Sequence, residues 1–409
     1  MVSDGVVYIQ DMESNVFALD SADGNVIWRH LFHAGTPGPN GVAIDRGTVF
    51  GSTDTTVFAL VAKTGEVRWT RRILGDHESF VDVAPLAHGG LVYTATTGYG
   101  PGTRPAIYAL DASTGEVRWR FQTIRDPWRH PDEAGGGGVW QTPTLSEGTL
   151  YAGTANPLPW GGSPARPNGG AYPGRTLYTD SLVALDAGDG RLKWFDQVTP
   201  HDIRDHDFES PPIVAGRLVV GSGKGGQVVA WDRDRRTRVW RAEVGVHRND
   251  RGPLPAHSVA VCPGLLGGVE TPGSTSRGRS FFAVVELCHT ESATGAAAHS
   301  FASADPRRGR GEVVALDTKT GSRLWTAPLS SPPFGCTTVA NDVVFATTYD
   351  GQIIGFDVAN GSVVWRAHAR AGINACPSIV GNSLYVAAGT QTTRMLHPRY
   401  ELVAYRLTG

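Results

Sequence analysis

Short runs of alternating apolar and polar residues recur along the whole chain and predict β-strands. One pattern returns with them: hydrophobic-x-Ala-hydrophobic-Asp, a short polar turn with Gly, and then Trp. Its copies are Val16–Trp28, Val57–Trp69 (degenerate, without the Asp), Ile107–Trp119, Leu182–Trp194, Val229–Trp240, Val314–Trp325 and Ile354–Trp365. An eighth copy at residues 402–405 stops before its Trp strand. No segment reads as a long amphipathic helix.

This repeat predicts the architecture. Another strand precedes each copy, as at residues 6–8, and a short inner segment ending in Pro often comes before that strand. Three or four strands in a unit of about 40 residues are typical of a β-propeller blade. We expect an all-β, eight-bladed β-propeller in a single domain, residues 1–409, whose first blade lacks an inner strand. A seven-bladed ring with a stray hairpin is the alternative. Residues 271–310, rich in Ser, Ala, Gly and Arg, are expected to be a surface loop inserted in blade 6.

Composition narrows the class of function. The chain has 409 residues and a formal net charge of −2, so we expect no nucleic-acid partner. No run of 18 apolar residues occurs, so we expect no transmembrane helix. The first five residues lack the basic and apolar regions of a secretory signal. A start on a strand pattern, together with the unfinished eighth blade, favours a trimmed periplasmic or secreted chain, with a cytoplasmic protein as the alternative.

The repeat, read as Ala-x-Asp-x-x-Thr-Gly-x-x-x-Trp, resembles the tryptophan-docking motif of quinoprotein dehydrogenases. Non-enzymatic propellers share it, so it implies fold and not function. Gly135–Trp140, followed by Asn156-Pro-Leu-Pro-Trp, resembles the pyrroloquinoline quinone (PQQ) alcohol dehydrogenases more specifically. The resemblance implies that Trp140 stacks under the quinone and that Asn156 ligates a metal ion. Core packing is the alternative for Trp140.

A second segment, Gln197–Asp207, is similar to the family's Pro-His-Asp-x-Trp-Asp stretch, with Arg204 in the place of Trp. The resemblance implies that Asp205 is the catalytic base beside the metal. Asp207 stands two residues further on, a spacing found in the lanthanide-using branch. Two carboxylates at i and i+2 of an extended segment face the same side and could share one cation. A solvated acidic loop is the alternative.

The remaining motifs concern the cofactor. Lys224, in Gly221–Gly226, resembles the family's residue at the quinone oxygens, with an ordinary hairpin lysine as the alternative. Arg46, in Asp45-Arg46-Gly47, resembles the Asn-Arg-Gly arginine that binds a cofactor carboxylate. Thr97 and Gly98 fall where the family wraps the quinone acids.

The sequence also departs from the family pattern at two places. Gly100 occupies the place of a metal-binding Glu, and loss of one hard oxygen ligand weakens a divalent site. Asn40-Gly41 occupies the place of an adjacent-cysteine pair that covers the quinone.

The four cysteines bear on location. Cys262 and Cys288 match a structural disulfide of methanol dehydrogenase-like proteins, and such a bond would favour an extracytoplasmic location. Cys336 and Cys376 occupy equivalent places on consecutive inner strands and are expected to be free buried thiols. No Cys or Cys/His spacing indicates zinc.

The resemblance favours a PQQ-dependent dehydrogenase that oxidises an alcohol or aldehyde. Asp205 would remove the hydroxyl proton beside a metal-bound quinone, and Asn156, Asp205 and Asp207 would hold Ca²⁺ or a lanthanide ion. No Cys-x-x-Cys-His haem motif occurs, so the electron acceptor would be a separate molecule. One alternative is a propeller that has lost PQQ and performs other small-molecule chemistry in the same pocket. The other is a non-enzymatic scaffold for protein partners.

Overall fold

The computed structural model describes residues 1–36, 38, 40–75, 78–100, 102–125, 134–169, 174–294, 304–389 and 400–407. They form two compact units, which are described separately. Unit 1 comprises Met1–Pro159 and Gly174–His201, and unit 2 comprises Trp160–Pro173 and Asp202–Gly409. The single domain expected over the whole chain stays a prediction.

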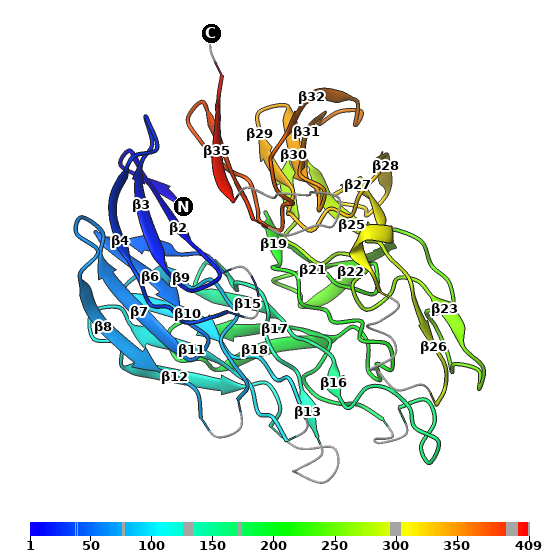
Figure 1. Cartoon of the computed structure of the whole chain (residues 1–409). Helices are drawn as coiled ribbons and strands as arrows, with labels where there is room; N and C mark the ends of the chain where they lie inside the picture. Colours follow the sequence, from blue (N-terminus) through cyan, green and yellow to red (C-terminus); the bar gives the residue numbers. More distant parts are fainter. Residues whose placement is uncertain are drawn as a thin grey trace. The chain divides into compact units, whose positions relative to one another are not determined.

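Unit 1 contains four antiparallel four-stranded sheets (Figure 1). Blade 1 has β1 (Val2–Ser3), β2 (Val6–Gln10), β3 (Val16–Asp20) and β4 (Val26–His30); blade 2 has β5 (Ala43–Asp45), β6 (Thr48–Ser52), β7 (Thr56–Val61) and β8 (Val67–Arg72); blade 3 has β9 (Leu86–His88), β10 (Leu91–Ala95), β11 (Ala106–Asp111) and β12 (Val117–Gln122); blade 4 has β14 (Thr144–Ser146), β15 (Thr149–Gly153), β17 (Ser181–Asp186) and β18 (Leu192–Gln197). A separate ribbon pairs β13 (Gly135–Gly136) with β16 (Pro157–Leu158).

Unit 2 contains three more four-stranded sheets and one three-stranded sheet. Blade 5 has β19 (Ile213–Ala215), β20 (Leu218–Ser222), β21 (Gln227–Asp232) and β22 (Thr237–Glu243); blade 6 has β24 (Ser274–Ser276), β25 (Arg279–Glu286), β27 (Arg310–Asp317) and β28 (Arg323–Leu329); blade 7 has β29 (Thr338–Ala340), β30 (Val343–Thr347), β31 (Gln352–Asp357) and β32 (Val363–His368); blade 8 has β33 (Ser378–Val380), β34 (Ser383–Ala388) and β35 (Glu401–Arg406). A ribbon pairs β23 (Val259–Val261) with β26 (His289–Glu291), and Pro306–Arg308 form a short 3-10 helix.

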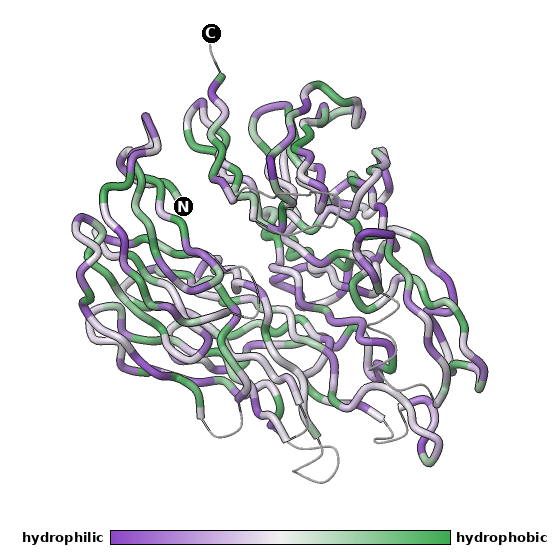
Figure 2. Tube along the Cα trace, in the orientation of Figure 1, coloured by the Kyte–Doolittle hydropathy of each residue, from purple (hydrophilic) through white to green (hydrophobic). Residues whose placement is uncertain are grey.

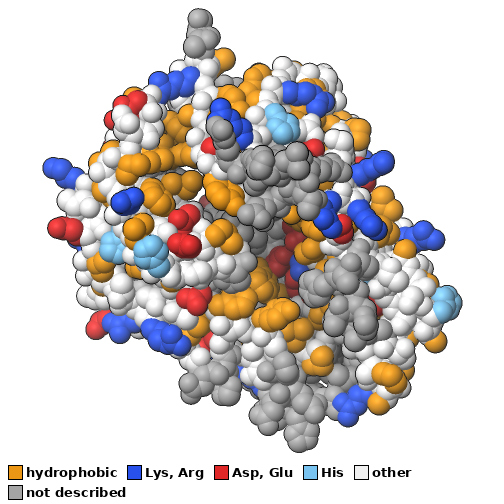
Figure 3. Space-filling view, in the orientation of Figure 1, with side chains coloured by type: hydrophobic (Ala, Val, Ile, Leu, Met, Phe, Trp, Pro, Cys, Tyr) orange, Lys and Arg blue, Asp and Glu red, His pale blue; other side chains and the backbone are white. Residues whose placement is uncertain are grey.

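The predicted all-β, eight-bladed propeller fold is confirmed, and no α-helix occurs among the residues described. Figure 2 shows hydrophobic residues concentrated along strands, whereas many turns are hydrophilic. Figure 3 shows basic and acidic side chains interspersed over the face that it draws. Within the described segments, no helix is long and apolar enough to span a membrane.

The repeated tryptophan joins neighbouring blades within each unit. Trp119 of β12 pairs with Ala109 of β11, and a β-bulge follows directly at Ala109/Leu110. The Trp119 Nε1–H donates to the Ala187 carbonyl of the next blade at 3.0 Å. A Cβ on Gly190 would lie 2.6 Å from the Trp119 ring, so the following turn needs glycine there. The same bond links Trp28 to Ala62, Trp69 to Ala112, Trp240 to Thr318 and Trp325 to Val358.

Two expectations about strands were wrong. Blade 1 has an inner strand, because Asp4 and Gly5, both with positive φ, make a tight hairpin that pairs β1 with β2. Residues 271–310 are not simply a surface loop, because β24 and β25 lie in blade 6 and β26 follows them. The apolar run Phe281–Val285 is at most 1% exposed, and burial of that run forms the strand. Residues 295–303 lie outside the described residues.

Each blade has two ends, and the direction of its strands decides which loops lie at each end. The first and second strands are antiparallel, as in the pairing of Ala43 with Phe50 in blade 2. The start of the first strand therefore lies at the same end of the blade as the finish of the second strand. We call this the site end. The opposite end carries the hairpin between these two strands.

Candidate active site

The candidate site in unit 2 is centred on one buried lysine. Lys224 follows β20, and its Nζ lies 2.5 Å from Oδ2 of Asp207 and 3.3 Å from Oδ2 of Asp205. The Lys224 N–H also donates to the Asp207 carbonyl at 2.9 Å. The three side chains are 12%, 3% and 12% exposed, respectively. The structure therefore brings three of the predicted site residues together at the site end of blade 5.

Asp202 holds the loop that presents Asp205. Its Oδ1 accepts the Arg204 N–H at 2.8 Å and its Oδ2 accepts the His206 N–H at 2.6 Å. These two bonds span Asp205, whose φ of 63° lies in the left-handed region. Asp tolerates that region better than most residues, but the conformation still needs support. The His206 Nε2 lies 3.0 Å from the Pro263 carbonyl and ties the loop to the segment that follows β23.

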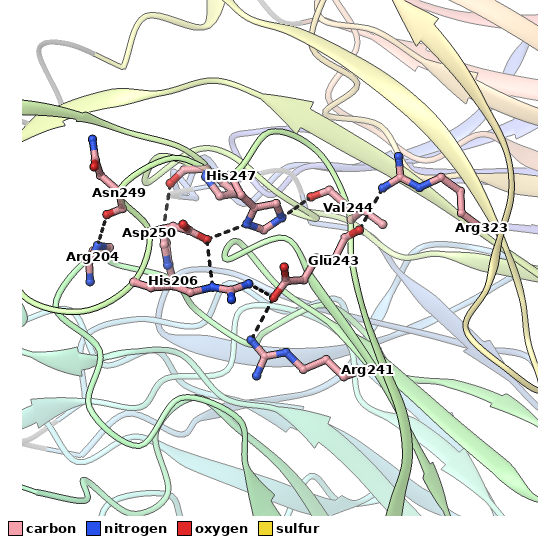
Figure 4. A network of polar contacts seen from close by, with 11 residues as sticks. Arg204, His206, Arg241, Glu243, Val244, His247, Asn249, Asp250 and Arg323 are labelled. Atoms are coloured by element: carbon pink, nitrogen blue, oxygen red, sulfur yellow. Dashed lines mark hydrogen bonds and ion pairs between the residues drawn. The ribbon is translucent and has the colours of Figure 1, made fainter.

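Arg204, which stands where the family has Trp, binds backbone rather than an acid partner. Its Nε donates to the Asn249 carbonyl at 2.9 Å, and an Nη donates to the Gly252 carbonyl at 2.6 Å. In the neighbouring network, His247 Nδ1 lies 2.7 Å from Asp250 Oδ2 (Figure 4). Arg204 therefore anchors residues 249–252 to the loop that carries Asp205.

The charges around Lys224 perturb one another strongly. Burial raises the pKa of Asp205 well above its usual value, and the Asp207 charge adds to this while Lys224 opposes it. Burial likewise raises the pKa of Glu209, and it raises that of Glu270 to about 7. Burial alone would lower the pKa of Lys224, but the surrounding carboxylates outweigh it and raise the pKa. One ammonium thus faces more acid groups than it can neutralise, which favours retention of protons by some of them.

The carboxylates offer hard oxygen ligands, but Lys224 already pairs with both Asp205 and Asp207. Among the residues that the structure describes, no three His, Cys, Asp or Glu side chains converge to hold an ion. Asn156, the third predicted ligand, belongs to unit 1, whereas Asp205 and Asp207 belong to unit 2. The residues of unit 2 alone therefore do not fit a metal ion.

In unit 1, a glycine run lies between the site ends of blades 3 and 4. The Val139 N–H donates to the Thr96 carbonyl at 3.3 Å, and the Ala155 N–H donates to the Gly138 carbonyl at 2.8 Å. A Cβ on Gly138 would lie 2.6 Å from the Gly98 nitrogen, so side chains are excluded there. The structure thus places Gly98 beside this run.

Trp140 is the last residue of this glycine-rich run, and its side chain is half-buried. It meets Phe80 edge-on, with ring centroids 5.6 Å apart, and it belongs to none of the buried core residues. Thr97 is bound to the same residue, since its N–H and Oγ1 donate to the Phe80 carbonyl at 2.8 and 3.1 Å. Asn156 is buried, and its carbonyl accepts the Gly137 N–H at 2.8 Å. Trp140 is thus only partly buried, and its role under a quinone stays a prediction.

Arg46 is not part of this group. It occupies the hairpin between β5 and β6, at the end of blade 2 opposite the site end. Its side chain is 70% exposed and pairs with Asp45 at 3.3 Å. The arginine was predicted as a cofactor ligand because Asp-Arg-Gly resembles Asn-Arg-Gly, but here Arg46 and Gly47 have the positive φ angles of a tight turn. The structure therefore leaves Arg46 out of the candidate site.

Sequence reasoning missed several residues that the fold brings to the site ends. Glu209 is buried and continues the i, i+2 series of Asp205 and Asp207, which was the available signal. Glu270 precedes β24, and no spacing relates it to the others. In unit 1, Asn40 and Asp82 precede β5 and β9 and carry buried polar atoms without hydrogen-bond partners.

The cysteines form two disulfides, both in unit 2. The Cys262–Cys288 bond, implied by the family resemblance, is present with Cα atoms 4.6 Å apart. The expectation of free thiols at Cys336 and Cys376 was wrong, because these residues are also bonded. Their equivalent places before β29 and β33 bring the Cα atoms within 4.8 Å, a distance that a disulfide spans.

Comparison with known proteins identifies the family of the chain. A family model described as outer membrane protein assembly factor BamB (PQQ_2) matches residues 12–262 and 286–409. The chain belongs to this family. The predicted kinship with quinoprotein alcohol dehydrogenase-like propellers is confirmed by the relatives below.

The quinohemoprotein alcohol dehydrogenase of Comamonas testosteroni is 28% identical over 456 residues, covering 92% of this chain. This chain spans only 64% of that relative's length. The structure of quinohemoprotein alcohol dehydrogenase ADHIIG from Pseudomonas putida HK5 is similar with a TM-score of 0.80 at 22% identity, covering 95% of this chain and 69% of that one. BamB from Moraxella catarrhalis has a TM-score of 0.61 at 17% identity, covering 95% and 89%. At these identities, the two structures show the fold alone.

Proposed function

We propose that the protein is a PQQ-dependent oxidoreductase that oxidises a small alcohol or aldehyde. The observation that carries the proposal is the buried Lys224–Asp205–Asp207 group. A scaffold gains no stability from three charged side chains removed from water, because desolvation offsets much of their attraction. Perturbed, buried ionisable groups gather instead at sites that perform chemistry.

In this proposal Asp205 accepts the hydroxyl proton of the substrate. Its raised pKa brings it nearer the range in which a carboxylate can take and release a proton efficiently. Asp202 keeps the carboxyl group in place, and Lys224 stabilises the ionised form. When bound, PQQ would supply the electron sink, and Trp140, Thr97, Gly98 and Lys224 are the residues that we propose to hold it.

The metal and the electron acceptor remain predictions of the same proposal. Asn156, Asp205 and Asp207 are our predicted ligands for Ca²⁺ or a lanthanide ion, although no step above depends on that ion. We propose that a separate molecule accepts the electrons. Two disulfides support a periplasmic or secreted location.

The test is to add PQQ, with and without Ca²⁺ or La³⁺, to the purified protein and to measure quinone absorbance after desalting and the melting temperature. Binding to the folded state alone should add about 2.7 kcal/mol of stability at a hundredfold excess over Kd. Lys224→Met should weaken binding, whereas Lys193→Met, at a lysine on β18 outside the site, should not. Asp205→Asn should lower turnover by about 10²–10⁴-fold with PQQ still bound.

The same experiment addresses the two alternatives. Absence of retained quinone and of any melting shift would remove PQQ from the function. Turnover that persists without PQQ but is lost in Asp205→Asn would indicate other small-molecule chemistry. A protein with neither property would be the scaffold that the BamB description of the family model makes a candidate.

A further inference from the structure

Two polar atoms at the site ends of blades 2 and 3 have no hydrogen-bond partner. They are Nδ2 of Asn40 and Oδ1 of Asp82, and both are buried. A buried donor or acceptor left unpaired costs about 1–3 kcal/mol, so such atoms call for an explanation. One is a donor and the other belongs to a carboxyl group, and both lie in unit 1.

The segments that carry these atoms lie side by side. The Gly38 N–H binds the Asp82 carboxylate, and a Cβ on Gly38 would lie 2.8 Å from Oδ2 of Asp82. A Cβ on Gly41 would lie 3.6 Å from that of Ala84. Gly38 and Gly41 therefore lie along residues 82–84, and Asn40 falls between these two glycines in the sequence.

Asp82 lies next to residues that contact the segment carrying Trp140. Val81 and Val83 are 0% and 1% exposed and belong to two different core clusters, one with residues of blades 2 and 3 and one with residues of blades 3 and 4. Phe80, Asp82 and Ala84 are each only partly buried. Phe80 meets the Trp140 ring, and Thr142 Oγ1 donates to the Ala84 carbonyl at 2.8 Å. Asp82 thus lies between two contacts with the segment 140–142.

Among the residues that the structure describes, no cationic side chain compensates Asp82. Burial raises its pKa to about 6, opposed in part by the Gly38 N–H, and no charged group of the described segments contributes to the shift. Segment 38–41 carries no titratable side chain among its described residues. The acids nearest along the other contacting segments are Asp54, whose carbonyl accepts the Val81 N–H, and Glu78, which binds Tyr108 and Arg120. Asp82 is therefore easily protonated in mildly acidic solution and then becomes a hydrogen-bond donor.

We propose that Asn40 and protonated Asp82 form a carboxylate-binding pair beside Trp140, each donating one hydrogen bond to an acid group of the ligand that stacks there. The identity of the ligand rests on the proposed function, since PQQ carries three carboxylic acid groups. Two neutral donors replace the arginine expected for this role, which the structure places at the other end of blade 2. Ionised Asp82 would repel the same ligand, so the pair binds acids only when Asp82 holds its proton.

The test is the Kd of PQQ, measured by tryptophan fluorescence between pH 5.5 and 8 without substrate. In the native protein, Kd should fall at least about tenfold from pH 8 to pH 5.5, because each unit of pH below the Asp82 pKa favours the protonated form. Asp82→Asn should bind equally well at every pH, since an amide always donates. Asp82→Ala should also be independent of pH but bind about tenfold more weakly than Asp82→Asn, since it lacks the donor. Asn40→Ala should weaken binding about tenfold throughout.

Asp45→Asn is the matched control, because Asp45 lies at the opposite end of blade 2, where its replacement should leave the pH profile unchanged. A Kd independent of pH in the native protein, or equal binding by Asp82→Ala and Asp82→Asn, overturns the pair. The aromatic acid 2-naphthoate, titrated in parallel, separates the two proposals. If it shows the pattern while PQQ does not bind, the pair stands and the PQQ function falls. If neither ligand binds, both fall.

Discussion

At the scale of single residues, the candidate base depends on a neighbour that does not touch the substrate in our proposal. Asp202 is 2% exposed and accepts two backbone N–H groups, one on each side of Asp205. Its spacing from Asp205 was visible in the sequence, but its role was not. Only the folded loop shows that one carboxylate spans a residue with positive φ. Asp202 is therefore a positioning residue.

Replacement of Asp202 tests this role. Asp202→Ala should destabilise the protein by about 2–4 kcal/mol, because it leaves two buried N–H groups unpaired, and Asp202→Asn by about half as much. Urea unfolding measures the loss. The control is Asp189→Ala: Asp189 makes a similar bond to the Arg191 N–H at 2.9 Å but is 63% exposed, so water replaces the bond. Equal losses at Asp202 and Asp189 would contradict the role of Asp202.

At the scale of elements, the repeat determined most strands because each copy encodes the same contacts. The alanine before the bulge leaves room for the paired tryptophan, and the glycine of the next turn lets that ring lie flat on the backbone. The two failures have physical causes. The β1 strand is too short to show alternation, and the apolar run of β25 was hidden in a polar-rich stretch. Sequence pattern thus identifies strands that are long enough to repeat.

The docking contact predicts a contrast between two glycines of blade 4. Gly190 and Gly148 have φ angles of 72° and 68°, but only Gly190 meets a tryptophan ring. Gly148→Ala should cost about 1–2 kcal/mol from backbone strain alone. Gly190→Ala should cost about 1–3 kcal/mol more, because its Cβ overlaps Trp119. Thermal or urea unfolding compares the stabilities of the two variants. Equal losses of stability would show that the contact between Gly190 and Trp119 does not stabilise the protein.

At the scale of the whole molecule, the two disulfides are an argument for the cellular compartment that we propose. Both bonds lie in unit 2, and one joins two consecutive blades. Spacing in sequence does not determine disulfide pairing, so the Cys336–Cys376 bond became evident only in the fold. Both bonds require an oxidising environment during folding.

Intact mass spectrometry checks this pairing. The protein isolated from an oxidising compartment should be lighter than its reduced form by two hydrogen atoms for each of the two bonds. Replacement of Cys262 and Cys288 by Ala should lower stability by about 2–4 kcal/mol, because the bond closes a loop with a sequence separation of 26 residues. A fully reduced mass after careful alkylation would contradict the proposed extracytoplasmic location.

By itself, the sequence determined the blade repeat and the i, i+2 spacing of Asp205 and Asp207, because these depend on local spacing, whereas Lys224 entered only through the resemblance to the family. Tertiary structure decided what spacing does not encode. It removed Arg46 from the site by placing it in a hairpin turn, and it brought Asn40 beside the segment that carries Asp82. Burial, which depends on every neighbour at once, raises the pKa values of Asp205 and Asp82.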